Sequence, residues 1–349
     1  MRRIAWRLTG SDFESLLLQF NLLEEVYGTK CLERMHLGAP SFVRFLGGNR
    51  YPRVVVTNRP SQREADWAYG PFASRAAAER FAEETLKLFL LRRCVEELDP
   101  NPSHPGCVYS EMKMCLAPCY QGCTDERYAE ESVGVERFLA TRGESRLVQL
   151  RTQRDEASAN LEFEQAAALH VQVQKAESVR ALAPELVRPM SRLRAVILQS
   201  SAQADEVAVF LYEGGRLHGP AGFSTLGMRI QNELSGSSSL FAQPMALEPV
   251  PEENTDQGSL SKESVKSARG ILEARLEGVL AGLQSAREAP NATVRQGHLA
   301  LLKRWYYRPE VKRPGEIFFP DVDGAWPAKA ILRGLGRVAA KSMAAAAGA

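Results

Sequence analysis

The spacing of apolar positions predicts alternating strands and helices over the first part of the chain. Residues 3–8 alternate weakly between polar and apolar side chains, as in a strand. Residues 12–27 repeat apolar side chains at intervals of three and four, the period of a helix with one buried stripe. Two further strands are expected over 42–46 and 51–57, joined by a turn, and a second helix over about 74–91. Together these patterns indicate a small mixed α/β unit.

The rest of the chain carries mainly helical patterns, with one group of strands among them. Residues 125–142 predict a helix, and residues 147–179 predict two amphipathic helices that form an αα-hairpin. The segments 194–198, 206–212 and 216–220 alternate like a β-meander. The remaining predicted elements are a Ser-, Pro- and Glu-rich linker over 233–262, a helix over about 263–287, a helix carrying His298 and Trp305, and a frayed low-complexity tail at 341–349.

Length, composition and charge narrow the function classes. A chain of 349 residues suggests two or three domains, and a hydrophobic content of 44% is sufficient to build their cores. No apolar run approaches the ~20 residues that span a membrane. The 44 Lys and Arg residues nearly balance the 42 Asp and Glu residues, which excludes a uniformly basic DNA-coating protein but leaves local basic patches open. The N-terminal residues lack the apolar core of a signal peptide, so a cytoplasmic location is expected.

Five of the six cysteines lie between Cys94 and Cys123. They are spaced C-x12-C-x7-C-x3-C-x3-C, among prolines that interrupt regular structure. Disulfides would need an oxidising compartment, to which nothing in the sequence points. A zinc site usually shows paired C-x2-C spacings, which are missing here. An iron–sulfur cluster accepts four thiolates at irregular spacing, and ordinary buried cysteines are the remaining interpretation.

The segments LRRC at 91–94, GCVY at 106–109 and MCLAPC at 114–119 resemble the cysteine region of the UvrC family of DNA-repair excinucleases. The family's pattern is close to R-x-C, then PC-x-x-Y, then C-x-A-P-C, and its four cysteines hold a [4Fe–4S] cluster. The resemblance implies four cluster ligands: Cys94, Cys107, Cys115 and Cys119. Gly106 stands where the family has proline, the following tyrosine comes one residue early, and Cys123 is an additional thiol that is not counted as a ligand.

Resemblance to the UvrC family extends upstream of the cysteines. The segment ESLLLQ at 14–19 resembles a helix of the family's GIY-YIG nuclease domain, in which the first Glu, here Glu14, binds the catalytic metal. The segments YPRVVVT at 51–57 and YGPF at 69–72 resemble a strand and a turn of the same part of the family. The GIY and YIG segments and the catalytic arginine are not found, so Mg²⁺ and incision are expected only if the true start lies upstream of Met1. Without the resemblance, Glu14 is a first-turn acid favoured by the helix dipole.

The predicted hairpin resembles the UVR domain, whose core reads A-x-x-L-x-F-E-x-A-A-x-x-R-D. The match includes Ala157 and five residues to which the resemblance assigns partner binding: Leu161, Phe163, Glu164, Ala166 and Ala167. It ends where His170 and Val171 replace the Arg–Asp pair. A two-helix hairpin buries little apolar area by itself and tends to pack against a second one, which in the UvrC family belongs to UvrB. The other interpretation is a plain hairpin packed on its own domain.

Basic and aromatic residues are interleaved near the end of the chain. The candidate DNA-binding residues among them are Lys303, Arg304, Trp305, Arg308, Lys312 and Arg313. This composition suits contact with DNA through stacking and phosphate pairing. The alternative is a core tryptophan surrounded by solvated charges.

These patterns and resemblances predict an α+β multidomain fold. The expected parts are a partial GIY-YIG-like α/β domain over 1–93, a cysteine cluster region over 94–123, a helical region over 124–183 with the UVR hairpin at 147–179, and a β-meander with C-terminal helices over 190–349. The resemblance, over roughly residues 1–225, implies a component of nucleotide excision repair that docks a UvrB-like protein and binds damaged DNA, with incision absent from the chain as given. The alternative is a non-enzymatic regulator of the McsA type, whose paired C-x2-C ligands are missing here.

Overall fold

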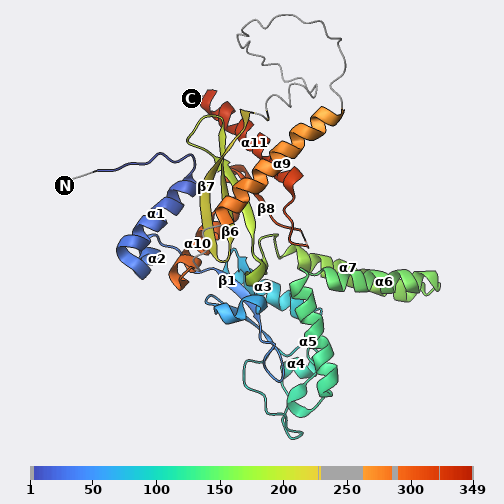
Figure 1. Ribbon diagram of the computed structural model, residues 1–349. Helices are drawn as coiled ribbons and strands as arrows, with labels where there is room; N and C mark the ends of the chain where they lie inside the picture. The colour runs from blue at the N-terminus through green and yellow to red at the C-terminus, as the bar shows by residue number, and fades with distance from the viewer. Residues whose placement is uncertain (1–3, 227, 229–261, 285–289, 322, 348–349) are drawn as a thin grey trace, which may run out of the picture.

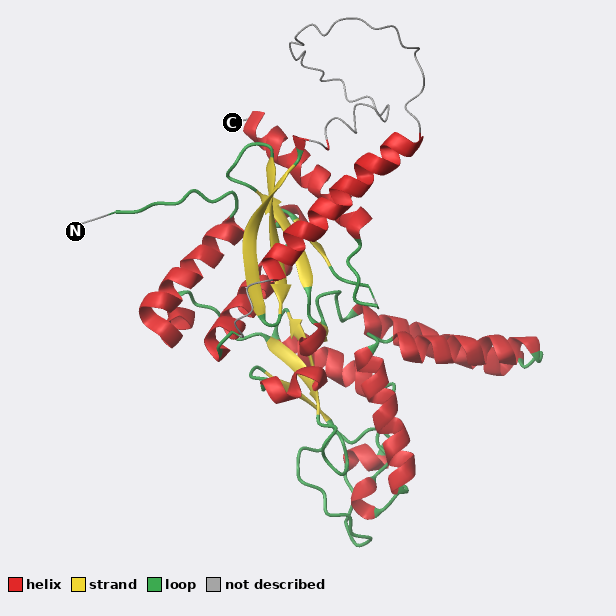
Figure 2. Ribbon diagram, in the orientation of Figure 1, coloured by secondary structure: helices red, strands yellow, loops and turns green. Residues whose placement is uncertain are grey.

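The computed structural model describes residues 4–226, 228, 262–284, 290–321 and 323–347. The protein has two antiparallel four-stranded sheets, one above the other in Figure 1. A helical hairpin projects sideways from the molecule, and the cysteine-containing loops lie at the lower end, beyond the lower sheet (Figures 1 and 2). This arrangement confirms the mixed helix and strand content expected from the sequence.

The lower sheet has the strand order β2-β1-β3-β4. Its strands are β1 (Ser41–Phe45), β2 (Val54–Thr57), β3 (Ala68–Phe72) and β4 (Arg188–Pro189). β1 and β2 form the predicted hairpin, and β4 pairs with β3 after the chain has passed through the helical hairpin. α3 (Arg75–Leu86) packs on this sheet, where the ring of Phe81 lies 5.3 Å from that of Phe72. The sheet therefore combines strands from both sides of the cysteine-containing loops.

The first helix forms where the sequence predicts it, but the strand before it does not. α1 (Asp12–Tyr27) begins after Ser11, whose Oγ accepts the N–H of Glu14 at 3.2 Å. Residues 4–8 pair with no strand of either sheet, so the strand predicted over 3–8 is wrong for the part that the structure describes. A weakly alternating segment becomes a strand only where a neighbouring strand supplies hydrogen bonds, and no described strand pairs with it here.

The upper sheet has the strand order β7-β6-β5-β8. Its strands are β5 (Ala195–Ser200), β6 (Glu206–Glu213), β7 (Arg216–Ser224) and β8 (Glu316–Phe318). β5, β6 and β7 confirm the predicted meander, whereas β8, which pairs with β5, was not predicted. Nearly all of β5 and β6 is buried, because helices pack against both faces of this sheet.

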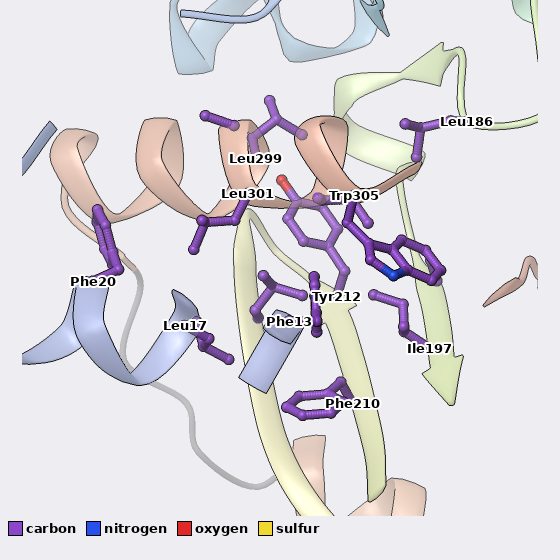
Figure 3. Packing of buried hydrophobic residues seen from close by; sticks show 14 of the residues in the cluster. Phe13, Leu17, Phe20, Leu186, Ile197, Phe210, Tyr212, Leu299, Leu301 and Trp305 are labelled. Atoms are coloured by element: carbon purple, nitrogen blue, oxygen red, sulfur yellow. The ribbon is translucent and has the colours of Figure 1, made fainter. Parts of the chain in front are cut away.

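One face of the upper sheet packs against α1 and α10 (Ala292–Tyr306), as Figure 3 shows. The ring of Phe13 meets that of Phe210 edge to face, with 5.2 Å between their centroids. Phe20 is fully buried, and its ring lies so close to the backbone of Gly297 that a Cβ at that position would be 2.1 Å from the ring. The N-terminal helix therefore shares its core with strands and a helix from the second half of the chain.

A buried histidine joins the same three elements by hydrogen bonds. Nδ1 of His298 accepts the N–H of Leu217 at 2.9 Å, and its Nε2 lies 3.3 Å from Oδ1 of Asn21. Burial, reinforced by the charge of Arg216, lowers the pKa of His298 to about 3. The ring is therefore neutral at physiological pH, and it connects α10 to β7 and α1 without carrying a charge into the core.

The opposite face of the upper sheet packs against α9 (Lys262–Gln284) and α11 (Ala328–Ala347). α9 confirms the helix expected over about 263–287, while the linker expected over 233–262 lies, except for its last residue, outside the described residues. The frayed tail predicted at 341–349 is wrong as far as residue 347, because α11 continues that far. Alanine has the highest helix propensity, so an alanine-rich end extends a helix that is already anchored in a core.

Three of the four central helices were predicted from the sequence, whereas the short helix within the cysteine-containing loops was not. The four helices are α4 (Val108–Glu111), α5 (Asp125–Ala140), α6 (Glu144–Ala159) and α7 (Phe163–Ala181). The hairpin of α6 and α7 has a small core of its own, made by Leu147, Leu150, Val173 and Ala176. None of the described helices meets the length and hydropathy that a membrane-spanning helix requires.

Candidate functional site

The cysteine-containing loops run between α3 and α5, beyond the lower sheet (Figure 1). Backbone hydrogen bonds hold them to one another. The N–H of Leu116 donates to the carbonyl of Leu90 at 3.0 Å, and the N–H of Asn101 donates to the carbonyl of Cys119 at 2.9 Å. The loops therefore have a fixed path in spite of their lack of regular structure.

Three residues with side chains adopt the left-handed backbone conformation near the cysteines. They are Lys113, Ala117 and Gln121, with φ angles of 53°, 54° and 60°. This conformation is costly for residues other than glycine, and such strain is concentrated at functional sites. At Ala117 it directs the backbone N–H to Sγ of Cys115 at 3.4 Å. The strained turn thus supplies a hydrogen-bond donor to one of the predicted ligand sulfurs.

Two of the four predicted ligand thiols have pKa values that other predicted ligands raise. Burial raises the pKa of Cys115, and Cys107, Cys119 and Cys94 raise it further. Burial also raises the pKa of Cys119, with smaller contributions from Cys107 and Cys94. Cys115 and Cys119 are therefore within electrostatic reach of the other predicted ligands, although α4 and two loops separate these residues along the chain.

The donor set predicted for these loops consists of four thiols. All six cysteines are free thiols, and among the described residues no three His, Cys, Asp or Glu side chains form a group that could hold a metal ion. Two of the four predicted ligand sulfurs, those of Cys94 and Cys115, accept hydrogen bonds from N–H groups. Four thiols, two of which receive N–H donors at sulfur, are a donor set that an iron–sulfur cluster would accept. Burial, Asp125 and Cys119 likewise raise the pKa of Cys123, so this additional thiol lies near one of the predicted ligands.

Arg92 received no role from the sequence, yet the structure places it at these loops. Its side chain is buried, and Nη1 lies 3.7 Å from Sγ of Cys94. A usable signal was present in the sequence: an arginine that follows an apolar pair and precedes a clustered cysteine by two residues.

The free end of the helical hairpin exposes apolar side chains. Leu161, in the turn with φ 62°, is 72% exposed, and Phe163, the first residue of α7, is 65% exposed. Ala157 is buried and accepts the N–H of Glu162 through its carbonyl at 2.9 Å, which closes the turn. The remaining predicted partner-binding residues, Glu164, Ala166 and Ala167, lie in the first turns of α7 and are exposed or partly exposed.

Glu14 lies apart from the cysteines, at the start of α1. It is buried, its Oε2 accepts the N–H of Gly10 at 2.9 Å, and Nη2 of Arg7 lies 3.9 Å from its Oε1. Together with Arg7 and Glu206 it lines a pocket of about 410 Å³. These contacts satisfy the carboxylate locally, in agreement with the interpretation of Glu14 as a first-turn acid. Within the described residues it does not belong to a group of side chains that could hold a metal ion.

Trp305, the tryptophan of the basic and aromatic segment, is buried. Trp305 is only 3% exposed, and its Nε1–H donates to the carbonyl of Pro314 at 3.1 Å. The expected stacking of Trp305 on DNA is therefore wrong, because the helical period of α10 directs this side chain into the core. Arg313 lies over the Trp305 ring, and Arg308 lies 3.6 Å from Asp12.

The remaining charges of this segment differ in their accessibility. Lys303 is half-buried, and burial lowers its pKa. Arg304 and Lys312 are exposed or partly exposed. Of the six candidate residues, only Arg304 and Lys312 have the solvent-exposed charge that contact with DNA phosphates requires.

Two protein-family models match the central part of the chain. Residues 42–138 match the model of the UvrC/Cho excinuclease middle domain, and residues 144–179 match the UvrB/uvrC motif. The first match includes the cysteine-containing loops, and the second spans α6 and most of α7. No solved structure matches the chain.

The curated relatives compared with this chain are UvrABC system C proteins. UvrABC system protein C of Leptospira biflexa is 29% identical over 232 residues, which are 65% of this chain and 37% of the relative. The proteins of the same name from Alcanivorax borkumensis and Escherichia coli are 29% and 30% identical over 180 and 182 residues, about half of this chain and 29% of each relative. The chain thus spans about a third of the length of these relatives. Residues 42–138 and 144–179 are thus similar to the UvrC family, as a UvrC/Cho-type middle domain followed by a UvrB/UvrC motif.

Proposed function

We propose that this chain is a UvrC-like component of nucleotide excision repair that docks a UvrB-like protein through the free end of its α6–α7 hairpin. The observation that carries the proposal is the exposure of Leu161 and Phe163 within the matched UvrB/UvrC motif. Both side chains project beyond the small core of the hairpin, so nothing within that core covers them. Burying a side chain of this size against a partner contributes about 1.5–3 kcal/mol.

The cysteine-containing loops are proposed to hold a [4Fe–4S] cluster. Cys94, Cys107, Cys115 and Cys119 would supply the thiolates, as the mutual influence of their thiols and the N–H donors to sulfur support. When bound, such a cluster cross-links an irregular loop and can exchange an electron. The alternative of an McsA-type regulator is not favoured, because the curated relatives are UvrABC system C proteins.

The proposed role in repair includes contact with damaged DNA but not strand incision by the described residues. Arg304 and Lys312 are accessible cations suited to phosphate contact. Glu14 is a single carboxylate that is already bonded to the backbone, whereas metal-dependent attack on a phosphodiester also needs a positioned nucleophile and further groups around the metal. The function proposed is therefore docking and DNA binding within a larger assembly.

Phe163→Ala is expected to weaken binding of a UvrB-type protein by about 2 kcal/mol, or roughly 30-fold in Kd, because exposed aromatic anchors dominate small interfaces. The measurement is a calorimetric titration of purified UvrB with the full chain. Val148→Ala provides the matched control: Val148 is an exposed apolar residue on α6, away from the hairpin turn, and its replacement should leave the Kd unchanged. Equal Kd values for the wild type and Phe163→Ala would contradict docking through the hairpin end.

A further inference from the structure

A cation is buried beside the cysteine-containing loops. Arg92 is 4% exposed, and its guanidinium makes three hydrogen bonds within the protein. Nε donates to the carbonyl of Tyr51 at 3.1 Å, and Nη1 donates to the carbonyl of Glu96 at 2.8 Å and to Sγ of Cys94 at 3.7 Å. The side chain is thus held in one position by two backbone carbonyls, with one edge directed at a predicted ligand sulfur.

Within the described part of the chain, no carboxylate balances this charge. None of the ion pairs found among the described residues includes Arg92, and its three acceptors are two neutral carbonyls and a thiol. A second guanidinium approaches the same cysteine, because Nη1 of Arg53 donates to the carbonyl of Cys94 at 3.3 Å. Two guanidinium groups therefore contact Cys94, and neither of them forms an ion pair within the described residues.

Burying a charged group is expensive unless an opposite charge accompanies it. The sulfur of Cys94 is the only one of the three acceptors that can become an anion, and it does so when it binds a metal as a thiolate. A cluster held by four thiolates brings several negative charges to the place that Arg92 faces. The buried cation and the thiolates would then each supply the countercharge that the other lacks.

We propose that Arg92 is the positioning residue that balances the charge of a thiolate-bound iron–sulfur group through its contact with Cys94, an inference that rests on the cluster proposed above. The rigid guanidinium fork suits this role, because it reaches two carbonyls and a sulfur at the same time. The single ammonium of a lysine cannot reproduce that geometry. Arg92 therefore both orients the ligand and stabilises the more negative states of the group.

The proposal predicts opposite effects on the loaded and the unloaded protein. Arg92→Met keeps most of the volume of the side chain and removes the charge. In the unloaded protein it removes an uncompensated buried cation, so the melting temperature should stay the same or rise. In the loaded protein it removes the countercharge, so iron should be lost faster and the reduction potential of the group should fall.

The experiment uses the full chain, loaded with iron and sulfide under anaerobic conditions. Iron release to an excess of chelator, the reduction potential and the melting temperatures with and without iron are measured for the wild type, Arg92→Met and Arg92→Lys. We expect iron release at least about 10-fold faster for Arg92→Met, the usual cost of losing a residue that supports a metal ligand. Arg92→Lys should give an intermediate rate and restore most of the potential, because the charge remains.

Arg93→Met is the matched control, since it removes the same charge from the adjacent position. The guanidinium of Arg93 donates to the carbonyl of Leu86 at 2.8 Å and lies over the ring of Tyr109, and within the described residues it forms no hydrogen bond to a sulfur. Iron release and potential should match the wild type in this variant. Wild-type behaviour of Arg92→Met would overturn the role of Arg92 while leaving the cluster in place. A wild type that takes up no iron would overturn both.

Discussion

Replacing Cys115 by alanine is expected to abolish iron binding. All three of the other predicted ligands raise the pKa of the Cys115 thiol. Its sulfur also accepts a hydrogen bond from the N–H of Ala117 in the strained turn. Loss of one of four thiolates leaves an iron without its protein ligand and the buried loops without their cross-link. Iron and acid-labile sulfide, measured after anaerobic purification, should fall from about four irons per chain in the wild type to near zero.

Cys123→Ala is the control for the loss of a nearby thiol. Cys123 lies beyond the four predicted ligands along the chain, beside Asp125 at the start of α5, and its replacement should leave the iron content unchanged. A colourless wild-type protein with stoichiometric zinc would contradict the cluster. Retention of about four irons by Cys115→Ala would show that the ligand set is wrong.

Phe20→Ala is expected to lower the free energy of unfolding by about 3–5 kcal/mol, the usual cost of removing a buried phenylalanine ring. Phe20 is fully buried, and its ring fills the space between α1 and the backbone of Gly297 on α10. The cavity left by the substitution could close only if α1 moved toward α10. The packing of Phe13 on Phe210 opposes that movement. Urea denaturation followed by circular dichroism measures the change.

Leu22→Ala separates this packing from a general effect on the helix. Leu22 lies on the same helix but is 55% exposed, so its replacement should change the free energy of unfolding by at most about 0.5 kcal/mol. A similarly small change for Phe20→Ala would mean that Phe20 does not fill the space between α1 and α10.

Periodicity predicted the local elements well, because each pattern reports how one segment divides its faces between core and solvent. The meander and the helical hairpin follow from such patterns alone. Contacts between distant segments leave no periodic signal. The packing of α1 on the upper sheet, the short strand β8 and the missing strand at residues 4–8 depend on which segments meet in space.

The candidate site shows the same division. The spacing of the cysteines and the resemblance to UvrC indicated four ligand thiols, and this ligand set stays a prediction, while three of these thiols contribute to the raised pKa of the fourth, Cys115. Trp305 was misassigned because an aromatic residue among lysines and arginines has the same local sequence whether it faces DNA or the core. For Arg92 the sequence shows only its position two residues before Cys94, whereas its burial and its contacts with two carbonyls and a thiol are seen only in the structure.

The central claim is that this chain joins a UvrB-type protein at damaged DNA. The direct measurement is an electrophoretic mobility assay with a damaged duplex onto which UvrB has been loaded by UvrA and ATP. We predict that adding the full chain retards the UvrB–DNA complex further, while the same duplex without UvrB is bound only weakly and in a manner that falls steeply with salt. Unchanged migration of the UvrB–DNA complex, or retardation that is equally strong without UvrB, would contradict this claim.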